Sequence, residues 1–330
     1  MANAYTGNGP ENTIQARTVM LTDMMDEIIS IEAKTNDMTP NAAILRGTQE
    51  ANVVELATAD IDGLGAYSKK NGYPFGSADL SWKKYTLKHD RSRAFMLDNI
   101  DIMQSGGLAS AGYMMGEFVR RKVIPEVDAT RIAGVAKAVA DRATADAGNA
   151  LGNIVYSQNL TASNILTKLR EGFDSILQNA GIEGGLTVYM DAKYRSVLQS
   201  SDEITNVRQV DGASESIGNI VSIVDGNTIK YVPSVRMKTA YDYLDGTTGG
   251  QEDGGFKPAT DAKSINFIVR APNTCYGIVN TQSEKYIPKE NNVLADADFM
   301  AIRIYHDVVI PFHTIEGLYV SVKETAPSSS

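Results

Sequence analysis

The chain has 330 residues, 43% of them hydrophobic, which is enough to build a substantial core as one large domain or two of ordinary size. Its formal net charge of −9 is unlike the basic excess of proteins that bind nucleic acid by neutralising phosphates. The single cysteine, Cys275, excludes an internal disulfide framework, and no apolar run reaches the roughly 20 residues that a membrane span requires.

The chain begins with a polar segment that has neither the basic nor the apolar region of a signal peptide, so we expect synthesis in the cytoplasm. Residues 14–34 then show a helical pattern, in which Met20, Met24, Ile28 and Ile31 recur at three- and four-residue spacing. The apolar stripe is narrow, and two interpretations stay open. It is either an ordinary amphipathic helix on the chain's own core or an arm that packs on a neighbouring molecule.

Residues 51–97 predict a long hairpin. The run Asn52–Thr58 is rich in β-forming residues, and Leu80–Leu97 contains alternating apolar and polar side chains. The segment between them is rich in Gly, Lys and Asn and includes a turn-forming Asn71-Gly72 pair. An isolated two-stranded ribbon is only marginally stable in water, so we expect this one to lie against something else.

A helix is expected from Leu108 to Lys122, because its apolar residues share one face. Glu117 and Arg121 stand four residues apart on it, which predicts an exposed acid–base pair. Pro125 should kink or restart this helix, since its ring and its missing N–H disrupt the hydrogen-bond ladder. The helical pattern then continues to Ala140.

The middle third of the chain predicts a compact α/β unit. It contains a helix that ends at Asn179 before Gly181, a strand at Leu186–Met190, a helix at 192–200, and a hairpin that turns at 225–227. A glycine-rich loop is expected at 245–263. After it the sequence predicts only short β runs, at Ile265–Arg270, Cys275–Val279, Phe299–Tyr305 and Gly317–Val322.

A search for catalytic chemistry finds little. None of the three histidines, His89, His306 and His313, stands beside a nucleophile signature, and Cys275 lies within a β run. The spacing of the histidines does not suggest a metal site, and the double glycines near residue 250 lack the strand and helix that a phosphate cradle needs. We therefore expect no enzyme activity, no cofactor and no metal, and ordinary surface or partly packed histidines.

Four segments, in order along the chain, carry a resemblance. In GYPFGSADLSWKKYTLKHDRSRAFMLDNIDIMQS (72–105), an Asp-Arg pair at Asp90 is followed by a Phe-x-x-Asp and a further aspartate. The others are GEFVRRKVIPEVDATRIAGVA (116–136), IKYVPSVRMKTAYDYLDG (229–246) and RIYHDVVIPFHTIEGLYV (303–320). Together they resemble the major capsid (coat) proteins of tailed bacteriophages with the Hong Kong 97-like fold.

This resemblance implies an α+β fold in four parts. They are an N-terminal arm (1–50), an extended E-loop hairpin (51–95), a peripheral domain with a long spine helix (96–155 and 264–312) and an axial α/β domain (156–263 and 313–330). The implied function is structural: self-assembly into pentamers and hexamers that form the icosahedral phage head. The expected location is the virion, after synthesis in the host bacterial cytoplasm.

The resemblance also implies partners. Besides copies of itself, the chain would use a separate scaffolding protein and a portal protein, with room for a decoration protein. It would enclose double-stranded DNA without sequence-specific binding, and it would not contact a membrane. The candidate residues for contact between subunits are Lys69, Lys70, Tyr73, Trp82, Arg91, Arg93, Asp98, Asp101, Glu117, Arg120, Arg121 and Glu126.

Two alternatives and one question remain open at this point. An encapsulin-like nanocompartment shell would share the fold, and an unrecognised α/β enzyme is a remoter alternative. Some members of the family cross-link a loop lysine to a neighbour's asparagine, for which Lys69 or Lys70 and Asn291 or Asn292 are candidates. The order of residues does not place the carboxylate that this reaction needs, so no cross-link is predicted.

Overall fold

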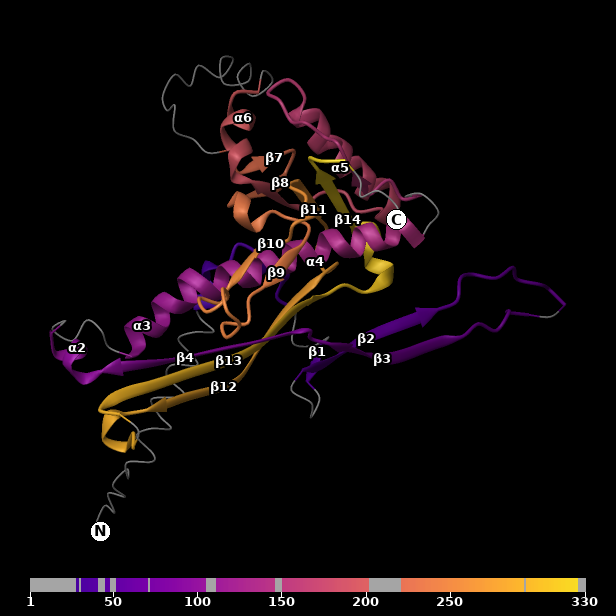
Figure 1. The fold of residues 1–330 in the computed structure, drawn as a ribbon. Coiled ribbons are helices and arrows are strands. Elements are labelled where there is room, and N and C mark those ends of the chain that lie inside the picture. The colour runs from indigo at the N-terminus through magenta and orange to yellow at the C-terminus, as the bar shows by residue number, and fades with distance from the viewer. Residues whose placement is uncertain are drawn as a thin grey trace, which may run out of the picture.

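The computed structural model describes residues 28–29, 31–40, 45–47, 52–70, 72–104, 111–145, 150–201, 221–293 and 295–325. These residues combine helices with several sheets, which confirms the predicted α+β class. Figure 1 shows a long helix that crosses the body between a six-stranded sheet and a three-stranded sheet. A narrow ribbon of two strands projects away from that body.

The six-stranded sheet has the strand order β5-β14-β11-β6-β8-β7. Helices α5 (Ile165–Ala180) and α6 (Arg195–Gln199) cover one of its faces, and Gly181 ends α5 in the left-handed conformation, as predicted. The strands are β5 (Ile154–Val155), β6 (Thr187–Asp191), β7 (Ile223–Val224), β8 (Asn227–Val232), β11 (Ile265–Arg270) and β14 (Leu318–Val322).

Strand β11 lies in the middle of this sheet, between β14 and β6. The predicted boundaries assign this strand to the peripheral part of the chain, whereas its hydrogen-bonded neighbours are strands of the six-stranded sheet. Phe267 packs on the α5 side and Ile268 on the opposite side, so both faces of the strand are buried. A strand buried on both faces is read from sequence as a plain apolar run, which does not reveal the sheet it joins.

The three-stranded sheet has the order β12-β13-β4, with all strands antiparallel. Its strands are β4 (His89–Asp98), β12 (Tyr276–Ile287) and β13 (Ala297–Val309). β12 and β13 are longer than predicted, because polar residues interrupt their apolar runs. Short helix α2 (Asn99–Gln104) follows β4, and a separate hairpin is formed by β9 (Tyr241–Tyr243) and β10 (Phe256–Pro258), the latter within the predicted loop.

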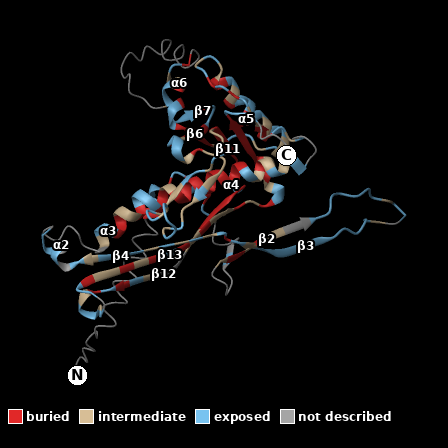
Figure 2. Cartoon of the chain, viewed as in Figure 1, coloured by how far each residue is buried: buried red, intermediate tan, exposed pale blue. Residues whose placement is uncertain are grey.

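The ribbon consists of β2 (Val53–Ile61) and β3 (Ala78–Thr86), with the short β1 (Leu45–Gly47) beside β2. The predicted second strand at 80–97 is wrong as a single element, because β3 pairs with β2 while β4 pairs with β13. The change of partner occurs at Leu87, whose buried side chain packs with Ile278 and Val309. Figure 2 shows that the ribbon is mostly exposed away from this base.

The long helical segment runs from residue 111 to residue 145. It consists of α3 (Ala111–Phe118), a π-helical turn (Val119–Val123) and α4 (Ile124–Ala145). The interruption predicted at Pro125 takes the form of this π turn, and the helix does not restart. A π turn widens the helix directly before the proline, which accommodates the missing N–H and the bulk of the ring.

The long helix belongs to two cores. Val127 packs with Met300 and Ile302 of the three-stranded sheet. Further along, Ile132 and Val139 belong to the core formed with the six-stranded sheet. Both sheets therefore pack on the same long helix.

The described part of the predicted arm lies on its own molecule. Ile28 and Ile29 are buried in the core of the three-stranded sheet, and Met38 is buried in the core of the six-stranded sheet. Ile31, a member of the predicted stripe, is 66% exposed, and Met20 and Met24 lie outside the described residues. Of the two open interpretations, packing on the chain's own core therefore holds for Ile28, Ile29 and Met38.

Gly134 marks the closest approach of α4 to β13, because a Cβ atom there would lie 2.2 Å from Cγ1 of Val308. Gly134→Ala should lower the free energy of unfolding by about 1–3 kcal/mol despite the better helix propensity of alanine. Adding Val308→Ala should restore part of that loss. Urea denaturation of both variants checks this, with Gly249→Ala, which meets open space, as the control. A stabilised Gly134→Ala variant would contradict the close packing.

Candidate assembly interface

The ribbon exposes large apolar side chains that no part of the described chain covers. Leu64 and Phe75 are fully exposed, and the rings of Tyr67 and Tyr73 lie 5.2 Å apart near the tip. Soluble monomers rarely expose apolar side chains in such a concentration, so the ribbon has the character of a contact surface. Its exposed apolar residues are Ile61, Leu64, Tyr67, Tyr73, Phe75, Leu80 and Trp82.

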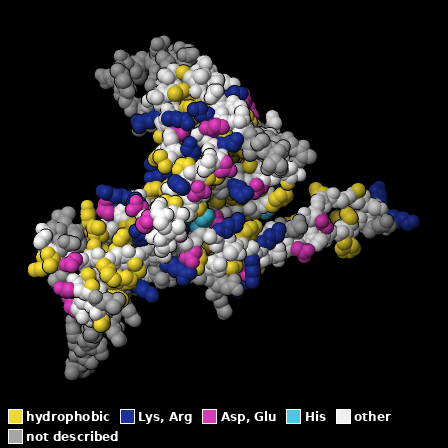
Figure 3. Space-filling model, in the orientation of Figure 1, with side chains coloured by type: hydrophobic (Ala, Val, Ile, Leu, Met, Phe, Trp, Pro, Cys, Tyr) yellow, Lys and Arg dark blue, Asp and Glu magenta, His cyan; other side chains and the backbone are white. Residues whose placement is uncertain are grey.

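The tip of the ribbon is basic. Lys69 and Lys70 are exposed there, and Ser68 and Gly72 exchange two backbone hydrogen bonds of 3.2 and 2.7 Å across the turn. Gly72 has a φ of +78°, which a glycine adopts without strain. Figure 3 shows basic side chains (dark blue) at the far end of the ribbon, with apolar side chains (yellow) along it.

Trp82 lies on β3, with the guanidinium carbon of Arg46 from β1 6.0 Å from the centre of its ring. It is partly exposed, as are most residues of β3. Among the predicted contact residues, the structure thus places Lys69, Lys70, Tyr73 and Trp82 together on the ribbon. The others lie elsewhere.

Three of those residues lie on the long helix and pair on its surface. Arg121 Nε lies 2.7 Å from Glu117 Oε2, the exposed pair expected from their spacing. Arg120 Nε lies 2.7 Å from Glu32 Oε1, which joins the helix to the described part of the arm. Exposed pairs of this kind contribute little stability, so these side chains can exchange partners readily.

Asp98 accepts a hydrogen bond of 2.7 Å from the backbone N–H of Ile100, and so begins α2. The backbone of Asp101 belongs to the same helix. Arg93 donates to the backbone oxygen of Glu252 at 3.2 and 3.3 Å, which ties β4 to the loop between β9 and β10.

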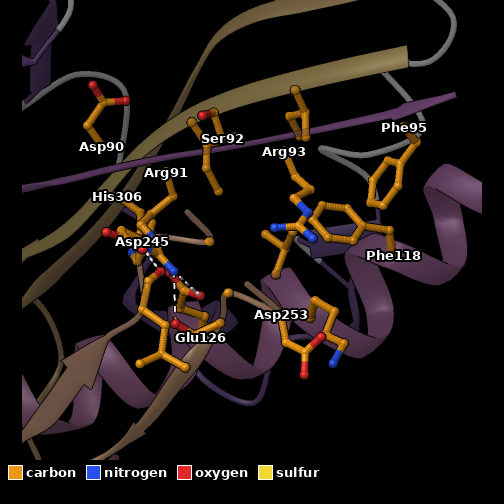
Figure 4. A pocket seen from close by; sticks show the side chains of 18 residues that line it. Asp90, Arg91, Ser92, Arg93, Phe95, Phe118, Glu126, Asp245, Asp253 and His306 are labelled. Atoms are coloured by element: carbon orange, nitrogen blue, oxygen red, sulfur yellow. Dashed lines mark hydrogen bonds and ion pairs between the residues drawn. The ribbon is translucent and has the colours of Figure 1, made fainter. Parts of the chain in front are cut away.

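Arg91 and Glu126 form a joint inside the molecule. Arg91 Nε donates to Glu126 Oε1 at 2.6 Å, and its two terminal nitrogens donate at 2.9 Å to the backbone oxygens of Leu244 and Gly255. These bonds connect β4, α4 and the β9–β10 hairpin (Figure 4). Both side chains are largely buried, and the contacts that the structure gives them are internal to the subunit; a contact with another subunit stays a prediction for both.

Two histidines complete this joint, which no local sequence pattern predicted. His89 and His306 face each other across β4 and β13, with ring centres 5.4 Å apart, and His306 Nε2 lies 3.6 Å from Glu126 Oε1. The ring of Tyr243 lies 4.4 Å from that of His89. Burial raises the pKa of Glu126, but His306 and Arg91 outweigh it, so the pKa falls below its usual value.

A pocket of about 660 Å³ opens beside the joint. Phe95, Phe118 and Ile302 form an apolar wall, while Arg93 and Asp253 lie among the charged residues that line it. Figure 4 shows these side chains converging from β4, the long helix and the loop after β9. The lining carries both signs of charge, which does not favour a simple anion site.

A buried network holds the described arm on the long helix. Both carboxylate oxygens of Asp128 are bonded: one accepts from the Thr35 hydroxyl at 2.7 Å, the other from Arg236 at 3.0 Å. Arg131 donates to the Thr35 backbone oxygen at 3.0 Å and to that of Gly277 at 3.0 Å. A buried charge needs such partners, because the uncompensated charge costs several kcal/mol.

Asp37 extends this network to the six-stranded sheet. It accepts hydrogen bonds from Lys230 and Tyr189 at 2.7 Å and from Arg270 at 2.8 Å. Burial raises the pKa of the Asp37 carboxyl, but these bonds and the charge of Arg270 outweigh it, so that its pKa lies below the usual value.

Among the described residues, no three acidic, histidine or cysteine side chains gather as they would around a metal ion. Within the same residues, no helix is both long enough and apolar enough to cross a membrane. Cys275 is buried, and burial raises the pKa of its thiol to about 11, which is unlike a reactive cysteine.

Comparison with known proteins gives a match in structure only. No protein-family model matches the sequence, and no curated protein sequence matches it significantly.

Solved structures of similar fold come from phages. A chain in the capsid structure of cyanophage P-SCSP1u matches with a TM-score of 0.53 and 11% identity, over 84% of this chain and 85% of that one. A chain of the mature capsid of bacteriophage PhiM1 matches with a TM-score of 0.50 and 13% identity, over 85% of this chain and 84% of that one. A chain from Gordonia phage Cozz matches with a TM-score of 0.50 and 15% identity, over 88% of this chain and 85% of that one. The chain thus shares the fold of phage capsid structures.

Asp128→Asn keeps the shape of the side chain but removes the charge that faces Arg236 and Arg131. We expect a loss of about 3 kcal/mol in the free energy of unfolding. Asp141→Asn, which breaks only the exposed pair with Lys137 on the same helix, should change stability by less than about 0.5 kcal/mol. Equal effects of the two substitutions in urea denaturation would show that the network does not hold the arm.

The lowered pKa of Asp37 predicts an acid dependence of stability. Because the folded state holds this carboxylate more strongly than the unfolded state, its contribution is full above the unfolded pKa of about 3.9. The contribution is lost as the pH falls through the folded pKa. Asp37→Asn should therefore reduce the loss of stability as the pH falls below about 4. Urea unfolding at several pH values measures this, and identical pH profiles would refute it.

Proposed function

We propose that this chain is a structural major capsid protein, which assembles into pentamers and hexamers of an icosahedral phage head. The observation that carries the proposal is the ribbon: it projects from a body with complete cores, and it exposes aromatic and aliphatic side chains that its own molecule does not cover. The shared fold with phage capsid structures supports the same function.

The mechanism follows from the physics of interfaces. Head-to-tail contacts that close on themselves generate rings, and a ribbon laid on the next molecule adds contact area to each step. A standard stable interface buries about 1,600 Å² in total. Many modest contacts per subunit make a shell strong through multivalency, while each single contact remains reversible.

The proposed contact surface of the ribbon comprises Lys69, Lys70, Tyr73 and Trp82. Further proposed contacts, on the surface of the body, are Arg93, Asp98, Asp101, Glu117, Arg120 and Arg121. In the vocabulary of the Hong Kong 97-like fold, the E-loop is the ribbon of β2 and β3. The peripheral domain contains the long helix and the three-stranded sheet, and the axial domain is built on the six-stranded sheet, now including β11.

The proposal includes the partners and location that such a head requires. These are a separate scaffolding protein, a portal protein, room for a decoration protein, and enclosed double-stranded DNA bound without sequence specificity. The phage origin of the matched structures favours a virion over a cell-borne nanocompartment. A structural role also needs no catalytic centre, which is consistent with the buried, unreactive Cys275.

Deletion of residues 68–76 tests the proposal. The variant should remain folded, because the removed tip is exposed and contributes to none of the described cores, but it should not form closed shells. Electron microscopy of the protein expressed with and without a scaffolding protein gives the readout, and circular dichroism confirms folding. Normal particles from this variant would remove the assembly role of the ribbon.

A matched pair of point variants separates this role from a general loss of apolar surface. Phe75→Ser on the ribbon should reduce the yield of closed particles severely. Ile223→Ser, on an exposed apolar side chain of β7, is the control away from the ribbon. If both variants assemble equally well or equally badly, the ribbon has no special part in assembly.

A further inference from the structure

The two faces of the ribbon differ in chemistry. Side chains alternate between the faces along each strand, and residues opposite each other in an antiparallel pair share a face. Ile61 and Leu80 are each 71% exposed and Trp82 is 42% exposed, and the register places all three on one face. This apolar face also carries Ala57 and Ala78, whereas the opposite, polar face carries Thr58, Asp79, Ser81 and Lys83.

At its base the ribbon is anchored to the body through the same side as the polar face. Val54 and Leu56 alternate in phase with Thr58 along β2, so they lie on that side of the ribbon. Both are buried in one core with Ile278 and Val309. The apolar face is therefore directed away from the core that anchors the ribbon.

A second exposed sheet face lies on the three-stranded sheet. Phe95 of β4 packs on Phe118 of the long helix, with ring centres 4.9 Å apart, while the next residue, Met96, is 53% exposed. Met96 is opposite the partly exposed Phe299 of β13, which is in turn opposite Ile287 of β12. These last three side chains form an apolar row on the face that is directed away from the long helix.

Two exposed sheet faces on one chain favour a contact between copies. Sheets pack face to face, about 10 Å apart, when both present apolar side chains. The ribbon and the row of Met96 lie at opposite ends of the molecule, so the ribbon of the same chain does not reach that row (Figure 1). A contact between two different surfaces of one chain is head-to-tail, and it repeats from copy to copy as a ring requires.

Charge favours the same partner. The tip of the ribbon carries the exposed Lys69 and Lys70, whereas the whole chain has a net charge of −9. A basic tip is therefore attracted to another copy of this acidic chain.

We propose that the ribbon docks through its apolar face alone, on the exposed face of the three-stranded sheet of a second copy. This docking rests on the assembly function proposed above, and it adds which side of the ribbon makes the contact and where. Leu80 and Trp82 lose water against the row of Met96, whose flexible thioether adapts to an aromatic ring. The polar face, with Ser81, stays in water.

A matched pair of neighbouring substitutions tests the choice of face. Leu80→Asp places a carboxylate on the apolar face, and Ser81→Asp places the same charge on the polar face of the same strand. Both side chains are exposed, so both variants should fold, which circular dichroism checks. Leu80→Asp should lower the yield of closed particles roughly tenfold or more, because the contact would bury an unpaired charge. Ser81→Asp should leave the yield within about twofold of the wild type.

The result separates this docking from the capsid function itself. Wild-type protein that forms no shell, even with a scaffolding protein, would remove the capsid function and the docking with it. Shells from both variants, or from neither, would overturn the choice of face while the capsid function stands. Electron microscopy of the wild type and of both variants gives these readouts.

Photocrosslinking of assembled particles identifies the partner surface. A benzophenone side chain in place of Leu80 should form links to peptides that contain Met96, Ile287 or Phe299. The same group in place of Ser81 should form few links. Particles mixed from isotopically light and heavy chains distinguish links between copies from links within one copy. Links confined to one copy, or to a different protein, would overturn the proposal.

Discussion

The long helix is shared between two hydrophobic cores, and the arrangement of every other element depends on this sharing. A helix that is apolar on more than one side is stable in water only when both sides are covered. Val127 packs against the three-stranded sheet and Ile132 packs in the core of the six-stranded sheet, so the same helix holds both sheets. The ribbon extends outward from the body that these cores form (Figure 1).

Buried charges fix the parts that the apolar cores leave undetermined. Asp128, Arg131 and Asp37 tie a short segment before the ribbon to the long helix and to the larger sheet. Arg91 ties the β9–β10 hairpin to β4 in the same way. Such pairs add little net stability compared with apolar packing, but they tolerate few alternative geometries. These pairs therefore determine the position of each segment more than they raise the free energy of unfolding of the whole chain.

The ribbon and the body differ in the way they achieve stability. The body buries its apolar groups within the chain, whereas Leu64, Phe75 and Trp82 of the ribbon have partial cover at best. Charged tip residues such as Lys69 keep this surface soluble in the free subunit. A surface of this kind is stable when another molecule covers it, which connects the shape of the subunit to the function proposed for it.

The sequence by itself determined the features that depend on local pattern. It predicted the helix ended by Gly181, the basic tip with its turn near Gly72, the exposed pair of Glu117 and Arg121, and the order of segments that suggested the fold. These signals are periodicity, turn chemistry and spacing, all of which are encoded within a few residues. The proposed contact role of Trp82 and Lys69 rests on the same local signals.

The tertiary structure decided the features that depend on distant residues. It divided the run at 80–97 into two strands, placed β11 in the larger sheet, and paired Arg91 with Glu126 in a joint between β4 and α4. It also brought His89 and His306 together from positions 217 residues apart. No local pattern predicts these pairings, because strand partners and buried ion pairs depend on packing across the whole chain.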